Sequence, residues 1–234
     1  MEYAQKQTKF YDPDGMVTVP NHIVFNSPVN LGDNIWILDN VLSVDFCEKV
    51  LGVFEKSKSH QMDGSTGSGI NKEIKDSKDI HLYQLQSNES KEIDLEFYRC
   101  LHDSTLRVVS ELTNHPCSIG WAPDYLFNHD TGYQLQKTQP GGRYVWHIEN
   151  AQSIDCFKTG SAARTLTYII YLNDVPEDHG GSTGFLYQKL KVQPKAGRLV
   201  LFPPYWTHLH SGYPLEKGIK YIMTGWFFSE AHNG

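Results

Sequence analysis

Cysteines are few in this sequence, and they are not paired. Cys47, Cys100, Cys117 and Cys156 are scattered through 234 residues, and no CxxC pair is present. Closely spaced cysteine pairs would indicate a structural zinc site or a disulfide framework, so the spacing disfavours both. We therefore interpret the four cysteines as free structural thiols and expect a reducing, cytoplasmic setting.

Long apolar runs and an excess of basic charge are also missing. No stretch has the ~20 apolar residues that span a membrane, and none has the pattern of a signal peptide. The formal net charge is −6, with 18 acidic against 11 basic residues in 1–120 and 9 against 10 in 121–234. A general nucleic-acid binder would carry a basic surface, so neither membrane nor nucleic acid is an expected partner.

The residues that are present suit one globular domain. Hydrophobic residues make up 39% of the chain and aromatic residues 12%, which is enough apolar material for a sizeable core. Residues 1–30 contain three prolines and show little periodicity, which predicts an arm lying on the domain. We expect residues 31–234 to form a single domain.

The first part of that domain, residues 31–120, has the pattern of a helical support. A strand is predicted at residues 35–38, followed by a helix that Ser43 can cap. Apolar residues at helical spacing predict a second helix from about residue 90 to 112. Residues 57–79 are rich in glycine, serine and charge, which predicts a long polar loop of the kind that is often functional.

The second part, from about residue 121 to 234, consists of short apolar or aromatic segments separated by turn residues. This pattern predicts the strands of a sandwich or jelly roll. The predicted strands are residues 133–135, 144–149, 166–172, 184–187, 198–202 and 221–228. Helices first and strands later predict an α+β protein, mainly β, with helices flanking a β core.

One strand carries a pair of candidate metal ligands. His147 and Glu149 alternate along it, so both side chains project from the same face. A second histidine from 207–210, either His208 or His210, would complete two-histidine, one-carboxylate ligation, which leaves open positions on iron(II). Lys220 could then bind the far end of a dicarboxylate. Each residue alone has an ordinary structural explanation, but the joint pattern indicates a metal site.

These residues lie within a longer series of motifs. In order along the chain, the motifs are residues 144–149, 164, 168–175, 180–185, 194–203, 210–214 and 218–221. From about residue 125 to the end, the sequence resembles the prolyl-4-hydroxylase-like 2-oxoglutarate oxygenases. The resemblance implies a double-stranded β-helix, which is a jelly-roll or cupin-like fold.

The resemblance also implies the roles of individual residues. His147, Glu149 and His210 would be the Fe(II) ligands, because the family's ten-residue step from distal histidine to basic residue selects His210 over His208. Lys220 would bind the distal carboxylate of 2-oxoglutarate. His208 would then lie beside the ligands or on the substrate side.

Other residues would surround this centre. Tyr171 and Thr224 are candidate hydrogen-bond partners for the 2-oxoglutarate carboxylate, although a core tyrosine and a strand threonine would look the same. Arg164, Trp146 and Tyr144 would lie around the mouth of the site, where they could contact substrate or simply pack.

The sequence departs from most relatives at two positions. Glu149 stands where most relatives have aspartate, and it supplies the same anionic oxygen on a longer arm. Ser182 stands where a Gly-Gly-Glu-Thr motif usually has glutamate, which is not a metal ligand.

The implied function is a dioxygenase that uses Fe(II), 2-oxoglutarate and O2, with ascorbate as an optional reductant. It would hydroxylate an unactivated carbon of a peptidyl proline, another protein side chain or a small molecule, and release succinate and CO2. Residues 57–79 are a candidate cover for the substrate.

Two other classes fit parts of the pattern: a non-catalytic, cupin-like module that binds a metal or small ligand, and a zinc hydrolase or isomerase. Lys220 argues against both, because neither needs a dicarboxylate clamp. No feature of the sequence indicates an oligomeric state.

Overall fold

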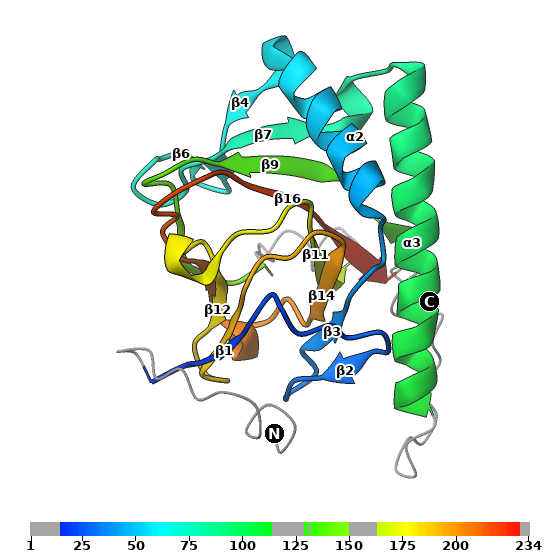
Figure 1. Ribbon diagram of the computed structural model, residues 1–234, viewed down its shortest axis with the longest axis vertical. Coiled ribbons are helices and arrows are strands. Elements are labelled where there is room, and N and C mark those ends of the chain that lie inside the picture. Colours follow the sequence, from blue (N-terminus) through cyan, green and yellow to red (C-terminus); the bar gives the residue numbers. More distant parts are fainter. Residues whose placement is uncertain (1–14, 114–128, 131, 150–162, 230–234) are drawn as a thin grey trace.

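The computed structural model describes residues 15–113, 129–130, 132–149 and 163–229, and within them the chain forms two main β-sheets with two α-helices (Figure 1). One apolar cluster lies between the sheets, with Val19, Phe185 and Val192 from the smaller sheet against Ile37 and Phe202 from the larger. This arrangement is the predicted jelly roll, so the fold class is confirmed.

The larger sheet is antiparallel and forms one wall of the roll. Its order is β2 (Val29–Asn30), β3 (Trp36–Leu38), β14 (Arg198–Phe202), β11 (Ala163–Tyr171), β16 (Lys220–Ser229), β9 (Gln134–Thr138), β7 (Lys78–His81) and β4 (Met62–Asp63), with β8 (His129–Asp130) also paired to β16. The two long central strands, β11 and β16, place Tyr171 opposite Ile222 and Thr167 opposite Trp226.

The smaller sheet forms the facing wall. Its order is β1 (Val17–Val19), β13 (Leu190–Val192), β12 (Thr183–Phe185), β15 (His210–Gly212) and β10 (Tyr144–His147). All its pairs are antiparallel except β1 with β13. A separate small hairpin pairs β5 (Ser65–Thr66) with β6 (Gly69–Ile70).

Both helices support the larger sheet. Helix α2 (Val44–Lys56) begins after Ser43, whose side-chain oxygen accepts a hydrogen bond from Phe46 N at 3.2 Å, as the capping prediction requires. Helix α3 (Asn88–Thr113) lies beside α2 in Figure 1, and Phe54 and Phe97 join the same apolar cluster as residues of β7, β9 and β11. Short 3₁₀ helices occupy Lys58–His60, Leu82–Gln84, Glu177–His179 and Trp206–His208.

The predicted helices and the seven predicted strands are confirmed within a few residues. The prediction for residues 57–79 was wrong in one respect, because this segment is not a plain loop: it contains β4, β5, β6 and the start of β7. Its strands are only two to four residues long, which is too short for hydrophobic alternation to reveal them.

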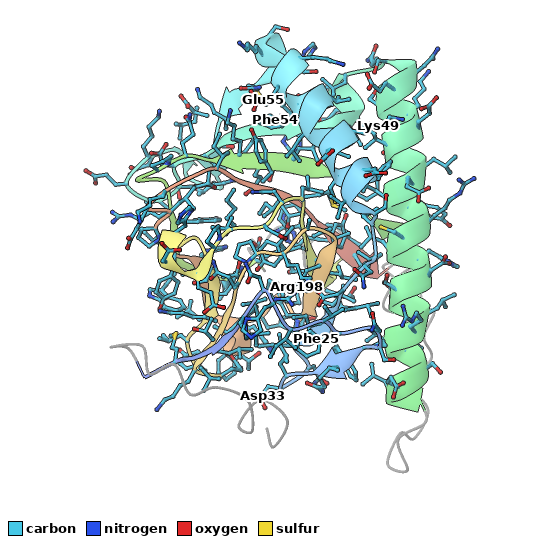
Figure 2. All side chains as sticks on the ribbon, in the orientation of Figure 1. Phe25, Asp33, Lys49, Phe54, Glu55 and Arg198 are labelled. Atoms are coloured by element: carbon cyan, nitrogen blue, oxygen red, sulfur yellow. The ribbon has the colours of Figure 1, made fainter. Side chains whose placement is uncertain are left out.

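Arg198 joins the N-terminal segment to the core (Figure 2). Its fully buried guanidinium donates to both carboxylate oxygens of Asp39, at 2.7 and 3.0 Å. It also donates to the carbonyl oxygens of Pro20 and Ile23, and its centre lies 5.6 Å from the Phe25 ring. Part of the expected arm is thereby held against the larger sheet.

Within the described ranges, neither α2 nor α3 is long and apolar enough to cross a membrane. Cys47 and Cys100 are buried free thiols, whereas Cys117 and Cys156 lie outside the described residues. Burial raises the pKa of the Cys47 thiol to about 11, so it stays protonated at neutral pH.

Candidate active site

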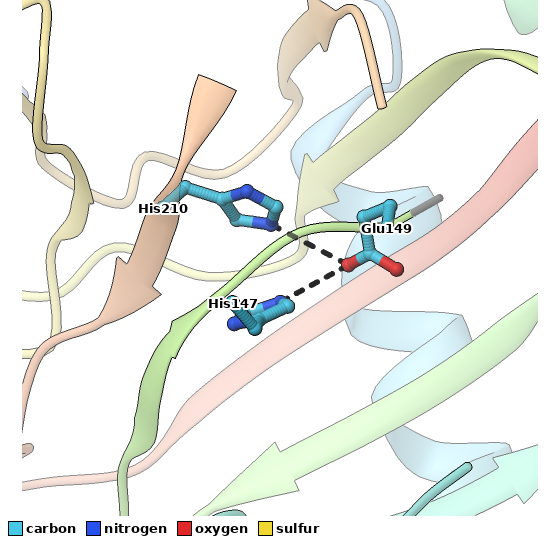
Figure 3. A group of neighbouring side chains, drawn as sticks. All are labelled: His147, Glu149 and His210. Carbon is cyan, nitrogen blue, oxygen red and sulfur yellow. Dashed lines mark hydrogen bonds and ion pairs between the residues drawn. The ribbon is translucent and has the colours of Figure 1, made fainter. Parts of the chain in front are cut away.

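The three predicted ligands meet inside the roll, two of them on strands of the smaller sheet and the third just beyond one of these strands (Figure 3). His147 ends β10 and is paired with His210, the first residue of β15, while Glu149 follows two residues after His147. Glu149 Oε1 lies 3.1 Å from His147 Nε2 and 3.4 Å from His210 Nε2. Atoms about 2.1 Å from one metal ion and at right angles lie about 3 Å apart, so the spacing fits a metal ion.

The hydrogen bonds of the two imidazoles fix which nitrogen faces the glutamate. His147 Nδ1 lies 2.8 Å from Val145 O, and His210 Nδ1 lies 2.9 Å from His208 O. A carbonyl oxygen can only accept, so each Nδ1 carries the proton and each neutral imidazole turns the Nε2 lone pair inward. Three electron-pair donors therefore converge on one point, which is the arrangement that a cation stabilises.

Burial and neighbouring groups shift the pKa values of His147 and Glu149. Burial, together with the nearby His210, lowers the pKa of His147, which favours the neutral imidazole that a metal requires. Burial alone would raise the pKa of Glu149, but contacts with His147 and His210 outweigh it and hold the pKa well below its usual range. Glu149 is therefore held as a carboxylate, the form in which it can bind a metal ion.

The cavity beside this group contains a buried cation. Lys220, at the start of β16, is 6% exposed, and its Nζ donates to Gly181 O at 2.7 Å. Burial lowers the pKa of Lys220 to about 8. No carboxylate oxygen of the described residues lies within 4.0 Å of its Nζ, so this ammonium has no counter-ion in that part of the chain. The cavity is lined by Lys75, Ser77, Gln136, Thr138, Arg143, Tyr144, His147, Glu149, Ile169, Thr183, His210, Gly212, Tyr213, Lys220, Ile222 and Thr224.

The two other predicted cosubstrate residues take different positions. Thr224 lines the cavity, and its hydroxyl donates to Tyr168 O at 2.8 Å. Tyr171 is fully buried behind Thr183, to whose Oγ1 its hydroxyl donates at 2.7 Å. The Tyr171 ring centre lies 5.8 Å from Lys220 Nζ, so this tyrosine forms part of the surroundings of the ammonium.

The residues expected around the mouth of the site lie in different places. Tyr144 lines the cavity and stacks on His147 with ring centres 3.5 Å apart, and the register of the pairing between β10 and β15 shifts between these two residues. Trp146 is 37% exposed and lines a second hollow on the outer face of the same sheet. His208 is buried away from the three ligands, with Nε2 2.7 Å from Asp33 O.

Sequence reasoning did not identify a buried ion pair at the cavity. Lys75 Nζ lies 2.6 Å from Asp79, whose other oxygen accepts from Ser77 at 2.8 Å, and both Lys75 and Asp79 are almost fully buried. The same segment runs along β10, with Val145 N donating to Ile74 O at 2.9 Å. Lysine and aspartate four residues apart in a polar stretch carry no sequence signal of such burial.

Fold and site together define a double-stranded β-helix protein with a two-histidine, one-carboxylate group in its interior. Residues 133–228 match the model of the 2OG-Fe(II) oxygenase superfamily. Residues 133–228 therefore form a 2OG-Fe(II) oxygenase domain, the class of domain that uses 2-oxoglutarate and Fe(II).

Solved structures with the same fold include three prolyl hydroxylases. A prolyl hydroxylase from Trichoplax adhaerens, in complex with a hypoxia inducible factor oxygen degradation domain peptide fragment, has a TM-score of 0.64, 19% identity, and coverage of 85% of this chain and 84% of its own. The viral collagen prolyl hydroxylase of Paramecium Bursaria Chlorella virus-1, in its 2OG complex, has a TM-score of 0.57 and 20% identity, with coverage of 85% of this chain and 97% of its own. A Pseudomonas putida prolyl-4-hydroxylase has a TM-score of 0.57 and 15% identity, with coverage of 82% of this chain and 91% of its own. No curated protein sequence matches the chain.

Proposed function

We propose that His147, Glu149 and His210 hold the catalytic Fe(II). The observation that carries this assignment is the convergence of two Nε2 lone pairs and one carboxylate oxygen at 3.1 and 3.4 Å, with both Nδ1 protons engaged by backbone carbonyls. Without a cation, these three acceptors would repel one another in a buried place. His208 is outside the ligand set, because its ring is engaged by Asp33 O and Thr207.

Lys220 is the proposed partner of the distal carboxylate of 2-oxoglutarate. A buried ammonium without a counter-ion is unfavourable, and burial already lowers its pKa to about 8. An arriving carboxylate would supply the missing charge, while Thr224 at the cavity wall offers a hydroxyl group nearby. Tyr171 would act through Thr183 and the ring face that it turns towards the ammonium.

Bound iron and 2-oxoglutarate supply the oxidising chemistry, with O2 as the third reactant and ascorbate as an optional reductant. The residues of the chain would bind the iron and 2-oxoglutarate and orient them. The backbone carbonyls of Val145 and His208 keep both imidazoles in one tautomer, so no proton competes with the metal at Nε2. The Tyr144 ring covers one face of His147 and excludes water from it.

For the substrate, we propose a prolyl residue or another side chain within a peptide. A peptide fragment accompanies one of the similar structures, and all three are prolyl hydroxylases. Residues 57–79 are the proposed cover for an extended peptide, and residues 74–76 of this segment lie along β10 at the edge of the cavity. A free small molecule is the alternative substrate, since the cavity itself would also accept one.

Cellular setting and domain division remain proposals from the sequence. We propose that the protein resides in the reducing cytoplasm, where its cysteines would stay as free thiols. We also propose that residues 31–234 form one domain and that residues 1–30 form an arm preceding it.

The reaction can be tested by measuring succinate formed from 2-oxoglutarate with Fe(II), ascorbate and O2. The His210→Ala protein should show no turnover. The Lys220→Ala protein should reach wild-type turnover only at much higher 2-oxoglutarate concentrations. Matched controls are His179→Ala and Lys137→Ala, which remove a histidine and a lysine that do not line the cavity. Loss of activity in the controls, or full activity in His210→Ala, would overturn the assignment. No turnover together with tight metal binding would favour a non-catalytic cupin-like module.

The substrate class needs a separate measurement. Proline-containing peptides and free small molecules would be incubated with the enzyme, and products with one added oxygen would be sought by mass spectrometry. Hydroxylation of a peptide at proline supports the proposal, whereas turnover of free small molecules alone would replace it.

A further inference from the structure

The second oxygen of Glu149 is held on the side away from the histidines. Trp226 Nε1 donates to Glu149 Oε2 at 3.0 Å, and the Arg164 guanidinium lies 3.6 Å from the same oxygen. Arg164 also donates to the backbone carbonyl of Glu149, and its guanidinium carbon lies over the Trp226 ring, 3.7 Å from the ring centre. The two oxygens of one carboxylate therefore face different partners.

This division matters because a glutamate arm is flexible. It has one more rotatable bond than aspartate, and both oxygens of a free carboxylate can reach a metal ion. Chelation through both oxygens would occupy a position that the cosubstrate or O2 needs. A hydrogen bond from the indole N–H and an ion pair with the guanidinium, both to one oxygen, restrict that freedom, because a hydrogen bond to an ionised carboxylate is strong and directional.

The fold makes the contact rigid. Trp226 lies on β16 opposite Thr167 of β11, and Arg164 lies near the start of β11, so both come from adjacent strands of the larger sheet. Glu149 approaches from the facing sheet, and its backbone N–H donates to Pro204 O at 3.1 Å. The carboxylate is thus fixed from the wall opposite the one that supplies the ligands.

We propose that Trp226 and Arg164 are positioning residues that fix Glu149 as a metal ligand through a single oxygen, Oε1. The proposal rests on the proposed metal ligation by His147, Glu149 and His210. It assigns the role specifically to the glutamate in this chain: an aspartate at the same place would withdraw the carboxylate by about 1.5 Å, one carbon–carbon bond length, beyond hydrogen-bond reach of the indole.

A double-mutant cycle tests this coupling. Co(II) alone would be titrated into four proteins, namely wild type, Trp226→Phe, Glu149→Asp and the double variant. Calorimetry gives the affinity, and the visible Co(II) spectrum reports coordination. Trp226→Phe should weaken Co(II) binding about tenfold and alter the spectrum in the glutamate protein, as removal of an outer-shell partner does. In the Glu149→Asp protein the same substitution should change the affinity less than about twofold.

Equal weakening in both backgrounds would show that Trp226 acts through general packing and would refute the proposal. No weakening in the glutamate background would refute it as well. Arg164→Met gives a second test without loss of the indole, with a several-fold loss expected only when Glu149 is present. Failure of the metal assignment itself has a different signature, because wild type and His210→Ala would then bind Co(II) equally. Urea unfolding midpoints of all the proteins identify any variant that is not folded.

Discussion

Raising the pH should weaken 2-oxoglutarate binding through Lys220. Burial lowers the pKa of this lysine to about 8, and only its protonated form can pair with a carboxylate. The apparent dissociation constant then rises by the factor 1 + 10^(pH − pKa), which is about 1.1 at pH 7 and about 11 at pH 9. Neither carboxylate of 2-oxoglutarate titrates in this range, so the tenfold loss would report on the lysine.

The assay is calorimetric titration of 2-oxoglutarate into the Mn(II)-loaded protein between pH 7 and pH 9. Binding above pH 8 should also take up a proton, which appears as a dependence of the heat on the buffer. Lys220→Arg is the matched control, because a guanidinium stays protonated throughout and its affinity should not change over this range. A wild-type affinity that does not change from pH 7 to pH 9, or a Lys220→Arg protein with the same slope, would refute the reasoning.

The lowered pKa of Lys220 also affects how the stability of the ligand-free protein depends on pH. The folded-state pKa of Lys220 is lower than the ordinary value of 10.5, so between pH 8 and 10.5 the unfolded chain binds more protons than the folded one. This group alone therefore makes the free energy of unfolding rise with pH across that window. Binding and stability should consequently respond to pH in opposite directions.

Three further substitutions probe the fold and the site. Arg198→Met leaves the buried Asp39 without its partner and should lower the free energy of unfolding by about 3–5 kcal/mol, with an unchanged urea midpoint contradicting this. Gly225→Ala places a Cβ 2.1 Å from Tyr168 Oη and should destabilise by about 1–3 kcal/mol, whereas combination with Tyr168→Phe should recover part of the loss in thermal unfolding. Tyr171→Phe should weaken 2-oxoglutarate binding about fivefold, which corresponds to about one hydrogen bond, and an affinity equal to wild type would place its hydroxyl outside the binding site.

Local patterns allowed much of the site to be predicted from the sequence. The spacing of His147 and Glu149 predicted that both project to one face, and both reach one point although β10 ends at His147. Helix α2 follows from Ser43 and the apolar spacing behind it, and β14 was predicted with its observed bounds. The step from His210 to Lys220 came from the resemblance to a family, which the match over residues 133–228 supports.

Contacts between distant parts of the chain were not predictable in this way. The parallel pairing of β1 with β13, the buried pair of Lys75 with Asp79, and the position of Tyr171 behind Thr183 depend on which strands become neighbours. No periodicity encodes that choice, because it follows from the packing of the whole roll.

The sequence by itself, through alternation, side-chain chemistry and its resemblance to a family, indicated the fold class, the candidate metal ligands and the lysine proposed to bind the cosubstrate. Only the tertiary structure decided how the ligands are held. It placed Trp226 and Arg164 of the larger sheet against Glu149 of the facing wall, and it buried Lys220 with no counter-ion among the described residues. These properties arise when two sheets close on each other, because closure sets both the distance between side chains and the loss of water around them.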